Sequence, residues 1–398
     1  MTIEQPQADL LERGVAEIIN RTSLEAKLRR RRPLRVKFGV DPTGYHLHLG
    51  HAVPLRKLAA WQRAGHHIIL IIGDYTAQVG DPSGRDKTRS SLTAEQTKDY
   101  SQTYLQQIGK ILDVRRVEVR YNSEWYDRLS AKNFLRLLGQ GSVNHIMAHE
   151  TFRRRLDLGQ GLGVHELVYP LLQGYDSVEV RADVELGGTD QKFNLLMGRD
   201  IQAANKQDQQ DVMMMEYLLG TDGKEKMSKT SNNFIALEDP PGEMYGKTMS
   251  IPDKMIVSFF TLCTDEPLER IAEIEHGLKK KTENPKKWKQ KLARDIVGIY
   301  HGTAAADEAE LEFTKVFSHK GLPKTIPRAR IKPGRHYLIN LLVSQRLVTS
   351  RSEARRLIEQ GGVKVNDQVV KDWQNEVTIQ NGTVLQVGKR RFMKLVAD

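Results

Sequence analysis

Apolar runs alternate with turn residues and amphipathic stretches through the first part of the chain. Apolar segments of strand length lie at 34–40, 67–72, 117–121, 178–186 and 233–237. Between the first two, residues 51–63 place their apolar side chains at helical spacing. Gly, Asp, Pro and Ser gather in loops at 41–44 and 80–85. This alternation predicts an α/β fold with a parallel sheet, and ligands of such sheets bind at the carboxyl ends of the strands.

The pattern changes near residue 240. From there to residue 318 the chain is rich in Lys and Glu at helical spacing, with a basic run at 279–291 that is either a solvated helix face or an RNA contact. Residues 319–334 hold three prolines and two glycines without periodicity, which predicts a linker. Residues 335–398 form a unit with two short helices and strands at 363–366 and 384–387. The expected domains are therefore 1–239, 240–318 and 335–398.

Composition narrows the class of protein. A length of 398 residues exceeds one compact core, which agrees with several domains. The formal net charge of +11 favours a polyanionic partner such as nucleic acid, although many soluble proteins are merely basic. The single cysteine, Cys263, excludes an internal disulfide, and no Cys/His cluster has zinc-ligand spacing. Residues 1–11 lack the apolar core of a signal peptide and no apolar run reaches membrane-spanning length, which predicts a reducing, cytoplasmic location.

The first chemical motif is Asp41-Pro42-Thr43 followed by His48-Leu49-Gly50-His51, where a strand passes into a helix. Two imidazoles three residues apart at a helix start lie close together, beside free backbone N–H groups and the positive end of the helix dipole. Gly50 carries no side chain and lets a base or sugar approach the backbone. The arrangement suits phosphate binding. A metal pair or two surface histidines are the alternatives, and a metal would need further ligands.

The second motif is Lys226-Met227-Ser228-Lys229-Thr230, which follows a Gly- and Asp-rich segment at 220–224. Its content is typical of a mobile loop. Two ammonium groups three residues apart could neutralise the charge on a leaving pyrophosphate. The alternative is a lysine-rich loop that is simply exposed. No GxxxxGK[ST] loop and no kinase-like glycine loop occurs, so ATP would bind in another way.

The pairing of HxGH near the N-terminus with KMSKx about 180 residues later resembles the class I aminoacyl-tRNA synthetases. Other segments resemble the tyrosyl-tRNA synthetase family in particular: Tyr-x3-Gln-x2-Asp at 169–176, Gly-Gly-Thr-Asp-Gln at 187–191 and Gly-Asp-Pro-Ser-Gly-Arg at 80–85. Residues 350–358 and 361–366 are similar to S4-type RNA-binding domains, which bacterial tyrosine enzymes carry and tryptophan enzymes do not. The resemblance covers nearly the whole chain.

The resemblance implies a Rossmann-like class I catalytic domain at 1–239, an α-helical anticodon-side domain at 240–318 and a small α+β S4-type domain at 335–398. It implies a tyrosine–tRNA ligase that makes tyrosyl-adenylate and pyrophosphate from L-tyrosine and ATP, then transfers tyrosine to the 3′ end of tRNA(Tyr). Mg²⁺ would accompany the ATP, and the enzyme would be a homodimer. The alternatives are a tryptophanyl-tRNA synthetase, a non-catalytic RNA-binding protein on a synthetase-like body, and an unrelated nucleotidyltransferase.

The resemblance also assigns residues. Catalytic roles fall to Thr43, His48, His51, Lys226 and Lys229. Tyrosine would be bound by Gly39, Asp81, Tyr169, Gln173, Asp176 and Gln191. ATP would be bound by Asp41, Gly50, Gly188, Asp190, Lys226, Met227, Ser228 and Lys229, with Arg85 and Arg89 as further phosphate contacts. RNA would be bound by Arg351, Arg355, Arg356 and Lys364, in a domain with eleven Lys/Arg against six Asp/Glu. No metal site is predicted.

Asp176 would accept a hydrogen bond from the substrate phenol, and a carboxylate in an aromatic-sized pocket penalises phenylalanine, which leaves it unpaired. The tyrosyl-tRNA synthetase family is itself a known example of this rejection of phenylalanine. Without the motif, Asp176 would pass for a surface helix residue, Tyr169 for an ordinary buried tyrosine and Asp41 for a turn cap. One residue departs from the family pattern: Lys37 stands where many members have a tyrosine that also holds the phenol. Lys37 would either donate to the phenolic oxygen or point away.

Overall fold

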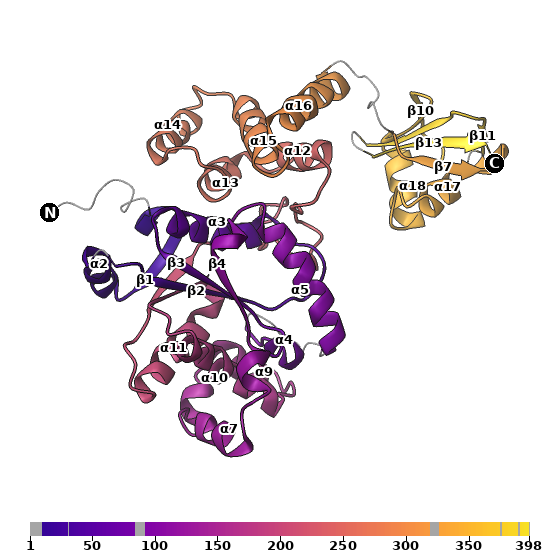
Figure 1. The fold of residues 1–398 in the computed structure, drawn as a ribbon. Coiled ribbons are helices and arrows are strands. Elements are labelled where there is room, and N and C mark those ends of the chain that lie inside the picture. The colour runs from indigo at the N-terminus through magenta and orange to yellow at the C-terminus, as the bar shows by residue number, and fades with distance from the viewer. Residues whose placement is uncertain are drawn as a thin grey trace. The chain divides into compact units, whose positions relative to one another are not determined.

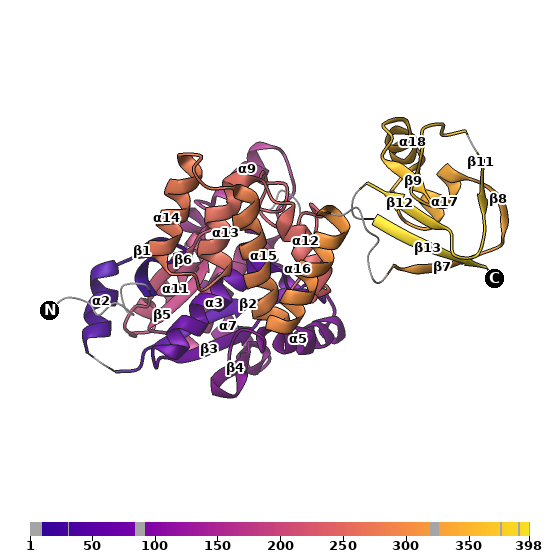
Figure 2. The same ribbon diagram turned by 90° about the horizontal axis from the view of Figure 1, so that it is seen from above.

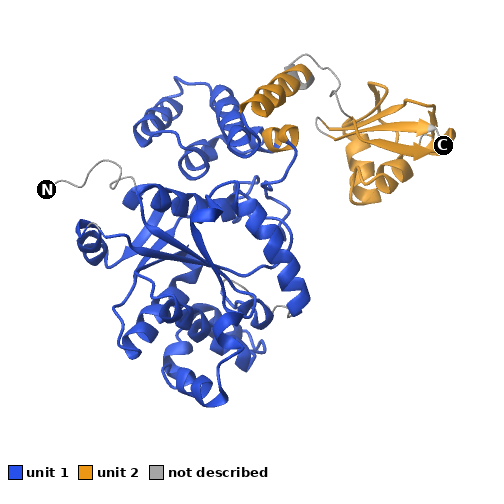
Figure 3. Ribbon diagram, in the orientation of Figure 1, with its two compact units in different colours: residues 1–240, 247–302 blue, residues 241–246, 303–398 orange. Residues whose placement is uncertain are grey.

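The computed structural model describes residues 10–30, 32–83, 92–318, 326–374, 376–388 and 391–397. Two compact units make up the chain, coloured separately in Figure 3. One contains residues 1–240 and 247–302, and the other contains residues 241–246 and 303–398. Arg85 and Arg89, predicted as phosphate contacts, lie outside the described residues. Among the described residues, no helix is both long and apolar enough to span a membrane.

A six-stranded sheet forms the centre of the first unit, in the order β1-β6-β5-β2-β3-β4. Its strands are β1 (Val15–Ile19), β2 (Arg35–Val40), β3 (His67–Ile72), β4 (Val117–Tyr121), β5 (Val184–Gly188) and β6 (Asp211–Met215). Strands β2 to β6 pair in parallel, and only β1 is antiparallel to its neighbour among these strands. The chain runs outward from β2 to β4 and then returns to β5 beside β2, so the strand order reverses between β2 and β5. This is a Rossmann-like sheet, and its ligand crevice lies at that reversal.

Helices cover both faces of this sheet (Figures 1 and 2). Helix α3 lies on one face and the packed pair α10 and α11 on the other. The helices of this part are α2 (Arg21–Arg29), α3 (Leu49–Arg63), α4 (Thr76–Val79), α5 (Ala94–Ile108), α6 (Ser123–Tyr126), α7 (Ala131–Leu138), α8 (Val143–Ile146), α9 (Glu150–Asp157), α10 (Val164–Glu179) and α11 (Lys192–Ala204). Strand β3 is apolar on both sides because both of its faces are covered.

Most of the predicted strands are confirmed. Segments 34–40, 67–72 and 117–121 correspond to β2, β3 and β4. The strand predicted at 178–186 is wrong in its first half, where α10 ends at Glu179 and β5 begins only at Val184. The strand predicted at 233–237 is also wrong, since Ala236 makes only an isolated bridge to His48. Strands β1 and β6 were not predicted.

Helices alone follow between Pro241 and Ser318, as the periodicity predicts. They are α12 (Pro241–Met249), α13 (Ile256–Cys263), α14 (Leu268–Lys279), α15 (Pro285–His301) and α16 (Thr303–Ser318). Helix α13 packs on α3 within the first unit, and an ion pair of 2.6 Å between Arg56 and Asp265 reinforces this contact. The basic run 279–291 covers the end of α14 and the start of α15.

The second unit ends in a small α+β body with a core of its own. A five-stranded sheet has the order β10-β9-β12-β13-β7, and β8 pairs with β11. Its elements are β7 (Arg328–Ile331), β8 (Gly334–Tyr337), α17 (Leu338–Ser344), α18 (Arg351–Glu359), β9 (Val363–Val365), β10 (Gln368–Val370), β11 (Glu376–Ile379), β12 (Val384–Val387) and β13 (Arg391–Ala397). The prediction of a linker throughout 319–334 differs from the structure, because β7 pairs in parallel with β13. Prolines stand before and after β7, and the exposed residues within it are basic. The hydrophobic pattern therefore did not predict this short edge strand.

Candidate active site

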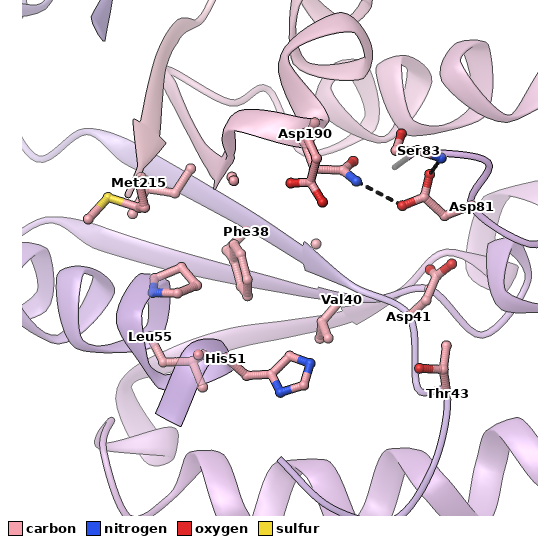
Figure 4. Close-up of a pocket in the computed structure, with 18 of the residues that line it drawn as sticks. Phe38, Val40, Asp41, Thr43, His51, Leu55, Asp81, Ser83, Asp190 and Met215 are labelled. Atoms are coloured by element: carbon pink, nitrogen blue, oxygen red, sulfur yellow. Dashed lines mark hydrogen bonds between the residues drawn. The ribbon is translucent and has the colours of Figure 1, made fainter. Parts of the chain in front are cut away.

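A cavity of about 930 Å³ opens at the carboxyl ends of β2, β5 and β6, where the strand order reverses. Every described residue of the first unit that was predicted to act on tyrosine or ATP lines it: Gly39, Asp41, Thr43, His48, Gly50, His51, Asp81, Tyr169, Gln173, Asp176, Gly188, Asp190, Gln191, Lys226, Met227, Ser228 and Lys229. Figure 4 shows the acidic groups Asp81 and Asp190 on one side and His51 and Thr43 on the other, with Phe38 and Val40 between them.

The two signature segments converge on this cavity although they lie far apart in the sequence. The N–H of Leu49 donates to the carbonyl of Ile235 over 3.0 Å, and His48 bridges to Ala236. A Cβ atom built on Gly50 would lie 3.5 Å from the Cβ of Met227 and 3.0 Å from the ring of His48. Glycine at this position therefore serves the packing of the imidazole and of the 226–230 loop, in addition to leaving space for a ligand.

The two imidazoles stack at the start of α3, with 3.8 Å between their ring centroids. The backbone N–H of His48 donates to Nδ1 of His51 over 3.2 Å, so the proton of neutral His51 sits on Nε2. Burial, then His48 and the two lysines, keep the pKa of His51 well below its usual value. Burial, then Lys229 and Lys226, lower the pKa of His48 to about 3. Both rings are neutral at physiological pH and offer N–H groups to a phosphate rather than charge.

The charge for phosphate comes from the lysines. The ammonium group of Lys226 pairs with Asp190 at 2.9 Å and lies 4.3 Å from the ring centroid of Tyr217. The ammonium group of Lys229 lies 5.9 Å from the ring centroid of Tyr104. Asp190, predicted to bind ATP, thus pairs with the loop lysine in this structure. Gly188 is required beside it, because a Cβ there would lie 2.5 Å from the Asp190 carboxylate.

Asn233 organises the loop that carries these lysines. Its Oδ1 accepts from the N–H of Ser228 at 2.9 Å, and its Nδ2 donates to Asp222 at 3.1 Å. Met227 is buried and anchors the loop, and its N–H donates to the carbonyl of Leu218 over 2.9 Å. The loop is therefore a folded turn rather than an exposed lysine-rich segment. Sequence analysis missed Asn233, since one asparagine after KMSKx carries no signal of its own.

A network of amides surrounds Asp81. Gln191 donates to Asp81 at 2.8 Å, and Asn194 donates to Gln173 at 3.0 Å and to Gln191 at 3.1 Å. The N–H of Ser83 also donates to Asp81 over 2.9 Å, as Figure 4 shows. Burial raises the pKa of Asp81, while these hydrogen bonds oppose the shift. Three residues of the predicted tyrosine site are thus linked through Asn194, which the sequence did not reveal.

Tyr169 and Asp41 form the next contact. The Tyr169 hydroxyl donates to Asp41 over 2.9 Å, and the hydroxyl of Thr76 donates to the other oxygen of Asp41 over 2.8 Å. Burial, with Asp41 and Asp81 nearby, raises the pKa of Tyr169 well above its usual value. Asp41 does more than cap a turn, because it joins the strand end of β2 to α10 and α4.

Asp176 is buried at the cavity wall and already has donors of its own. Trp125 donates to it through Nε1 at 3.0 Å, Tyr126 through its hydroxyl at 2.9 Å and Asn122 through Nδ2 at 3.4 Å. Burial raises the pKa of Asp176 to about 6, and Lys37 and these donors oppose the shift. The reading of Asp176 as a surface helix residue is excluded. Its three donors come from 122–126 and had not been predicted.

Lys37 does not point into solvent. Its side chain is fully buried and pairs with Glu185 at 2.9 Å. The two residues are cross-strand neighbours in the β2–β5 pairing, so the ion pair lies at the strand reversal itself. Glu185 lines the cavity. The lysine at this position was noticed in the sequence as a departure from the family pattern, but neither its burial nor its partner was predicted.

Three of the four predicted RNA-binding residues lie on one element of the second unit. Arg351, Arg355 and Arg356 are exposed on α18, and Lys364 lies on β9. The guanidinium of Arg355 stacks 4.6 Å from the ring centroid of Trp373 and pairs with Glu359 at 2.8 Å. Lys364 pairs with Asp367. The helix offers a row of cations to a phosphate backbone.

Comparison with known proteins supports the same assignment. Residues 29–318 match the family described as tRNA synthetases class I (W and Y). The chain belongs to this class I synthetase family. In this class I synthetase, residues 338–378 also match the S4 domain.

Relatives of this class I synthetase include two bacterial tyrosine–tRNA ligases. That of Moorella thermoacetica is 46% identical over 393 residues, which cover 98% of this chain and 95% of the relative. That of Thermotoga maritima is 45% identical over 395 residues, which cover 99% and 98%. Among solved structures, a C-terminally truncated mitochondrial tyrosyl-tRNA synthetase from Aspergillus nidulans has a TM-score of 0.67 at 22% identity, covering 79% of this chain and 95% of that one. At 22% identity, this structural likeness shows a shared fold.

Proposed function

We infer that the chain is a tyrosine–tRNA ligase. It would activate L-tyrosine with ATP and transfer the tyrosyl group to tRNA(Tyr). The observation that carries this inference is the convergence of the His48–His51 segment, the Lys226–Lys229 loop and the buried Asp176 on one cavity. The first two suit the phosphates of ATP and the third suits a phenol. Relatives that are 46% and 45% identical over nearly their full length are tyrosine–tRNA ligases.

The tyrosine end of the cavity would bind the amino acid by its three polar groups. Asp81, Tyr169 and Gln173 would hold the ammonium group, since a carboxylate with two neutral acceptors suits that ion. Asp176 would accept the phenol, and Gln191 would contact the carboxylate. Gly39 has no atom within 4 Å of a Cβ built on it, which leaves room for substrate. Phenylalanine would not supply the hydrogen bond from the substrate to Asp176, which would keep only its protein donors.

The ATP end would act by positioning and charge. The tyrosine carboxylate oxygen attacks the α-phosphorus, its new bond to phosphorus forms, and the bond to the pyrophosphate oxygen breaks. Thr43, His48 and His51 would donate to phosphate oxygens, and Lys226 and Lys229 would neutralise the departing pyrophosphate. Asp41, Gly50, Gly188, Met227 and Ser228 would shape the nucleotide site. Asp190 would exchange Lys226 for the ribose hydroxyls, which frees that lysine for the phosphates.

The second step transfers tyrosine to RNA. A hydroxyl of the 3′-terminal adenosine attacks the carbonyl carbon of the adenylate, and AMP leaves. No side chain has to form a covalent intermediate. We propose that Mg²⁺ enters this site with ATP, as part of the substrate.

The remaining domains would serve the RNA. We propose a catalytic domain at 1–239, a helical anticodon-side domain at 240–318 and an S4 domain at 335–398 that contacts tRNA through Arg351, Arg355, Arg356 and Lys364. The exposed guanidinium groups on α18 support this. We also propose a cytoplasmic location, which agrees with a single, buried cysteine thiol.

A homodimer is proposed as well. Exposed apolar side chains cluster on α7 to α10 of the first unit: Leu135, Val143, Leu156, Leu158 and Val164. Large exposed apolar side chains grouped on neighbouring elements are typical of an interface. Sedimentation velocity tests the assembly, and a species of monomer size at working concentrations would contradict it.

ATP–pyrophosphate exchange with each amino acid tests the function. We expect exchange with tyrosine and much less with phenylalanine or tryptophan. Tryptophan-dependent exchange would assign the chain to the other branch of its family. No exchange with any amino acid, combined with tRNA binding, would favour a non-catalytic RNA-binding protein. Aminoacylation of tRNA(Tyr) completes the test.

A further inference from the structure

A buried ion pair lies behind the tyrosine end of the cavity. The side chains of Lys37 and Glu185 are 0% and 1% exposed, and their charged atoms are 2.9 Å apart. Withdrawing two charges from water costs free energy that their mutual attraction often fails to recover, and an apolar pair of similar size would do as well or better for stability. Stability alone therefore gives a weak reason for a lysine at this place on β2.

The ammonium group of Lys37 has three N–H donors, and the protein uses all of them. They go to Glu185 at 2.9 Å, to the hydroxyl of Ser177 at 2.7 Å and to the backbone carbonyl of Gln173 at 3.0 Å. An ammonium group has no further proton to donate. Lys37 therefore does not serve as a hydrogen-bond donor to a phenol in this arrangement, unlike the tyrosine that many family members have here.

Two of these three acceptors belong to α10 and lie on either side of Asp176 in the sequence. Gln173 precedes it by one helical turn, and Ser177 follows it directly. Ser177 in turn donates to Glu185 over 3.1 Å. The pair thus ties the turn of α10 that carries Asp176 to strands β2 and β5, which fixes the position of the carboxylate relative to the cavity.

The charge of Lys37 also acts on Asp176. The groups that face Asp176 are Lys37 on β2, Trp125 and Tyr126 on α6 with Asn122 just before it, and Tyr169 on α10, which itself adjoins Asp41 and Asp81. Of these, Lys37 is the cation, while the donors from 122–126 are neutral. Burial raises the pKa of Asp176 to about 6, and Lys37 is the first of the influences that hold it down.

We propose that Lys37, braced by Glu185, is a positioning residue for phenol recognition, which holds the Asp176 turn and keeps the Asp176 carboxylate ionised without contacting the substrate. This inference rests on the proposed role of Asp176 as the acceptor of the tyrosine phenol. It replaces the direct second phenol contact of other members with an indirect, electrostatic one.

The test removes both charges together, so that no single charge remains buried. In Lys37→Met/Glu185→Gln we measure kcat and KM for tyrosine in ATP–pyrophosphate exchange from pH 5.5 to 8.5. Without the cation, Asp176 takes up its proton at higher pH. We expect the apparent pKa in kcat/KM for tyrosine to rise by about one unit, so that kcat/KM falls about tenfold where the variant is protonated and the wild type is not. We expect this pH-dependent loss to disappear by pH 8.5, where only a higher KM for tyrosine from the released Asp176 turn remains, with kcat within about twofold of the wild type.

A matched control is available in the same unit. Lys27 pairs with the fully buried Asp211 at 3.0 Å, and its ammonium group also donates to the carbonyls of Asp183 and Gln209. Lys27→Met/Asp211→Asn removes a similar pair outside the residues that line the cavity. We expect it to lower the thermal unfolding midpoint without moving the pH profile for tyrosine. Phenylalanine, which has no phenol, serves as the second substrate, and its kcat/KM stays unchanged in both double variants.

Three results would overturn the inference. An unchanged pH profile in Lys37→Met/Glu185→Gln would leave Lys37 a purely structural residue. Equal losses of kcat/KM for tyrosine and for phenylalanine would lead to the same conclusion. An unchanged KM for tyrosine at pH 8.5 would show that Lys37 does not hold the Asp176 turn.

Two further variants keep the inference testable if that double variant does not fold. Lys37→Arg keeps the charge but presents a planar group to three acceptors, so we expect the wild-type pH profile with a higher KM for tyrosine at every pH. A shifted profile or an unchanged KM would contradict the proposal. Asp176→Asn separates the two hypotheses: if the wild type exchanges tyrosine but this variant keeps its preference over phenylalanine, then the assignment of Asp176 fails, and without wild-type exchange the function itself fails.

Discussion

Burial of Asp176 makes tyrosine recognition depend on pH. Its pKa of about 6 stands above the ordinary 3.8, so the protonated form dominates below about pH 6. The folded state holds this proton more tightly than the unfolded state, so the contribution of Asp176 to the free energy of unfolding falls as pH rises from 3.8 to about 6. Tyrosine binding has the opposite dependence, because the ionised form is the better acceptor.

We therefore predict that kcat/KM for tyrosine rises through about pH 6 and then levels off. In Asp176→Asn the rise disappears, and KM for tyrosine increases about 10- to 150-fold, as expected for a lost hydrogen bond to a charged group. Exchange assays across pH 5 to 8 measure both effects. Phenylalanine is the control substrate, and a similar rise with phenylalanine would assign the titration to another group.

The lysines of the 226–230 loop carry the only full positive charges among the catalytic residues, since both histidines are neutral. Lys226→Ala and Lys229→Ala should each slow adenylate formation by about 10²- to 10³-fold, the usual loss for one donor to developing charge. Tyrosine binding should change less than threefold in either variant. Pre-steady-state kinetics separates the two quantities, and equal losses in both would argue against a role in the transition state.

Residues that act through a local motif could be predicted, and residues that act through folded contacts could not. Thr43, His48, His51 and Lys226 lie in short sequence motifs whose residue types and spacing indicate a chemical role. Asn122, Trp125 and Asn194 contact residues that line the cavity only because the 122–126 segment and α11 lie against α10. These contacts span 21 to 54 positions in the sequence, beyond the range of any periodic pattern. The binding surface was predictable, while the groups that orient it were not.

Among the elements, strands with a strongly apolar, β-branched composition were found and the others were not. Strand β3 (HIILII) has no competing interpretation. Strand β6 (DVMMM) is equally buried, but methionine favours helices and hides it. Strand β1 is the antiparallel edge of the sheet and buries no residue fully. Residues 178–183 alternate apolar and charged side chains at the end of α10, and this alternation cannot be distinguished from the pattern of a strand.

The loop that carries Lys226 and Lys229 depends on Asn233 for its shape. Asn233→Ala removes the hydrogen bonds to Ser228, Asp222 and Lys226. We expect KM for ATP to rise and kcat to fall by roughly tenfold together, while KM for tyrosine stays unchanged, since a misplaced loop weakens contacts to the phosphates alone. Ser231→Ala is the control, because its exposed hydroxyl binds only Glu225 among the described contacts. A rise in KM for tyrosine would place Asn233 in a wider structural role.

At the scale of the whole molecule, the two units differ in shape and in charge, and we propose that they bind different substrates. The first unit contains a cavity at the strand reversal, lined by two neutral histidines and two lysines that we propose for the phosphates. The second unit presents α18 with three exposed arginines. A net charge of +11 belongs to a chain that must bind an RNA as well as a nucleotide. Adenylate formation should therefore be separable from tRNA binding by substitution.

Arg355→Ala/Arg356→Ala tests this separation. Tyrosine-dependent pyrophosphate exchange should stay at the wild-type rate, because both arginines lie outside the residues that line the cavity. The KM for tRNA in aminoacylation should rise. The slope of log K against log salt for tRNA binding should become less steep by about one to two, because fewer phosphate contacts release fewer counterions on binding. Arg346→Ala/Lys371→Ala removes two other exposed cations of the same unit that do not belong to α18. If this control weakens tRNA binding equally, the contact is diffuse attraction by the whole basic unit rather than recognition by α18. A fall in pyrophosphate exchange in Arg355→Ala/Arg356→Ala would instead refute the division of labour between the two units.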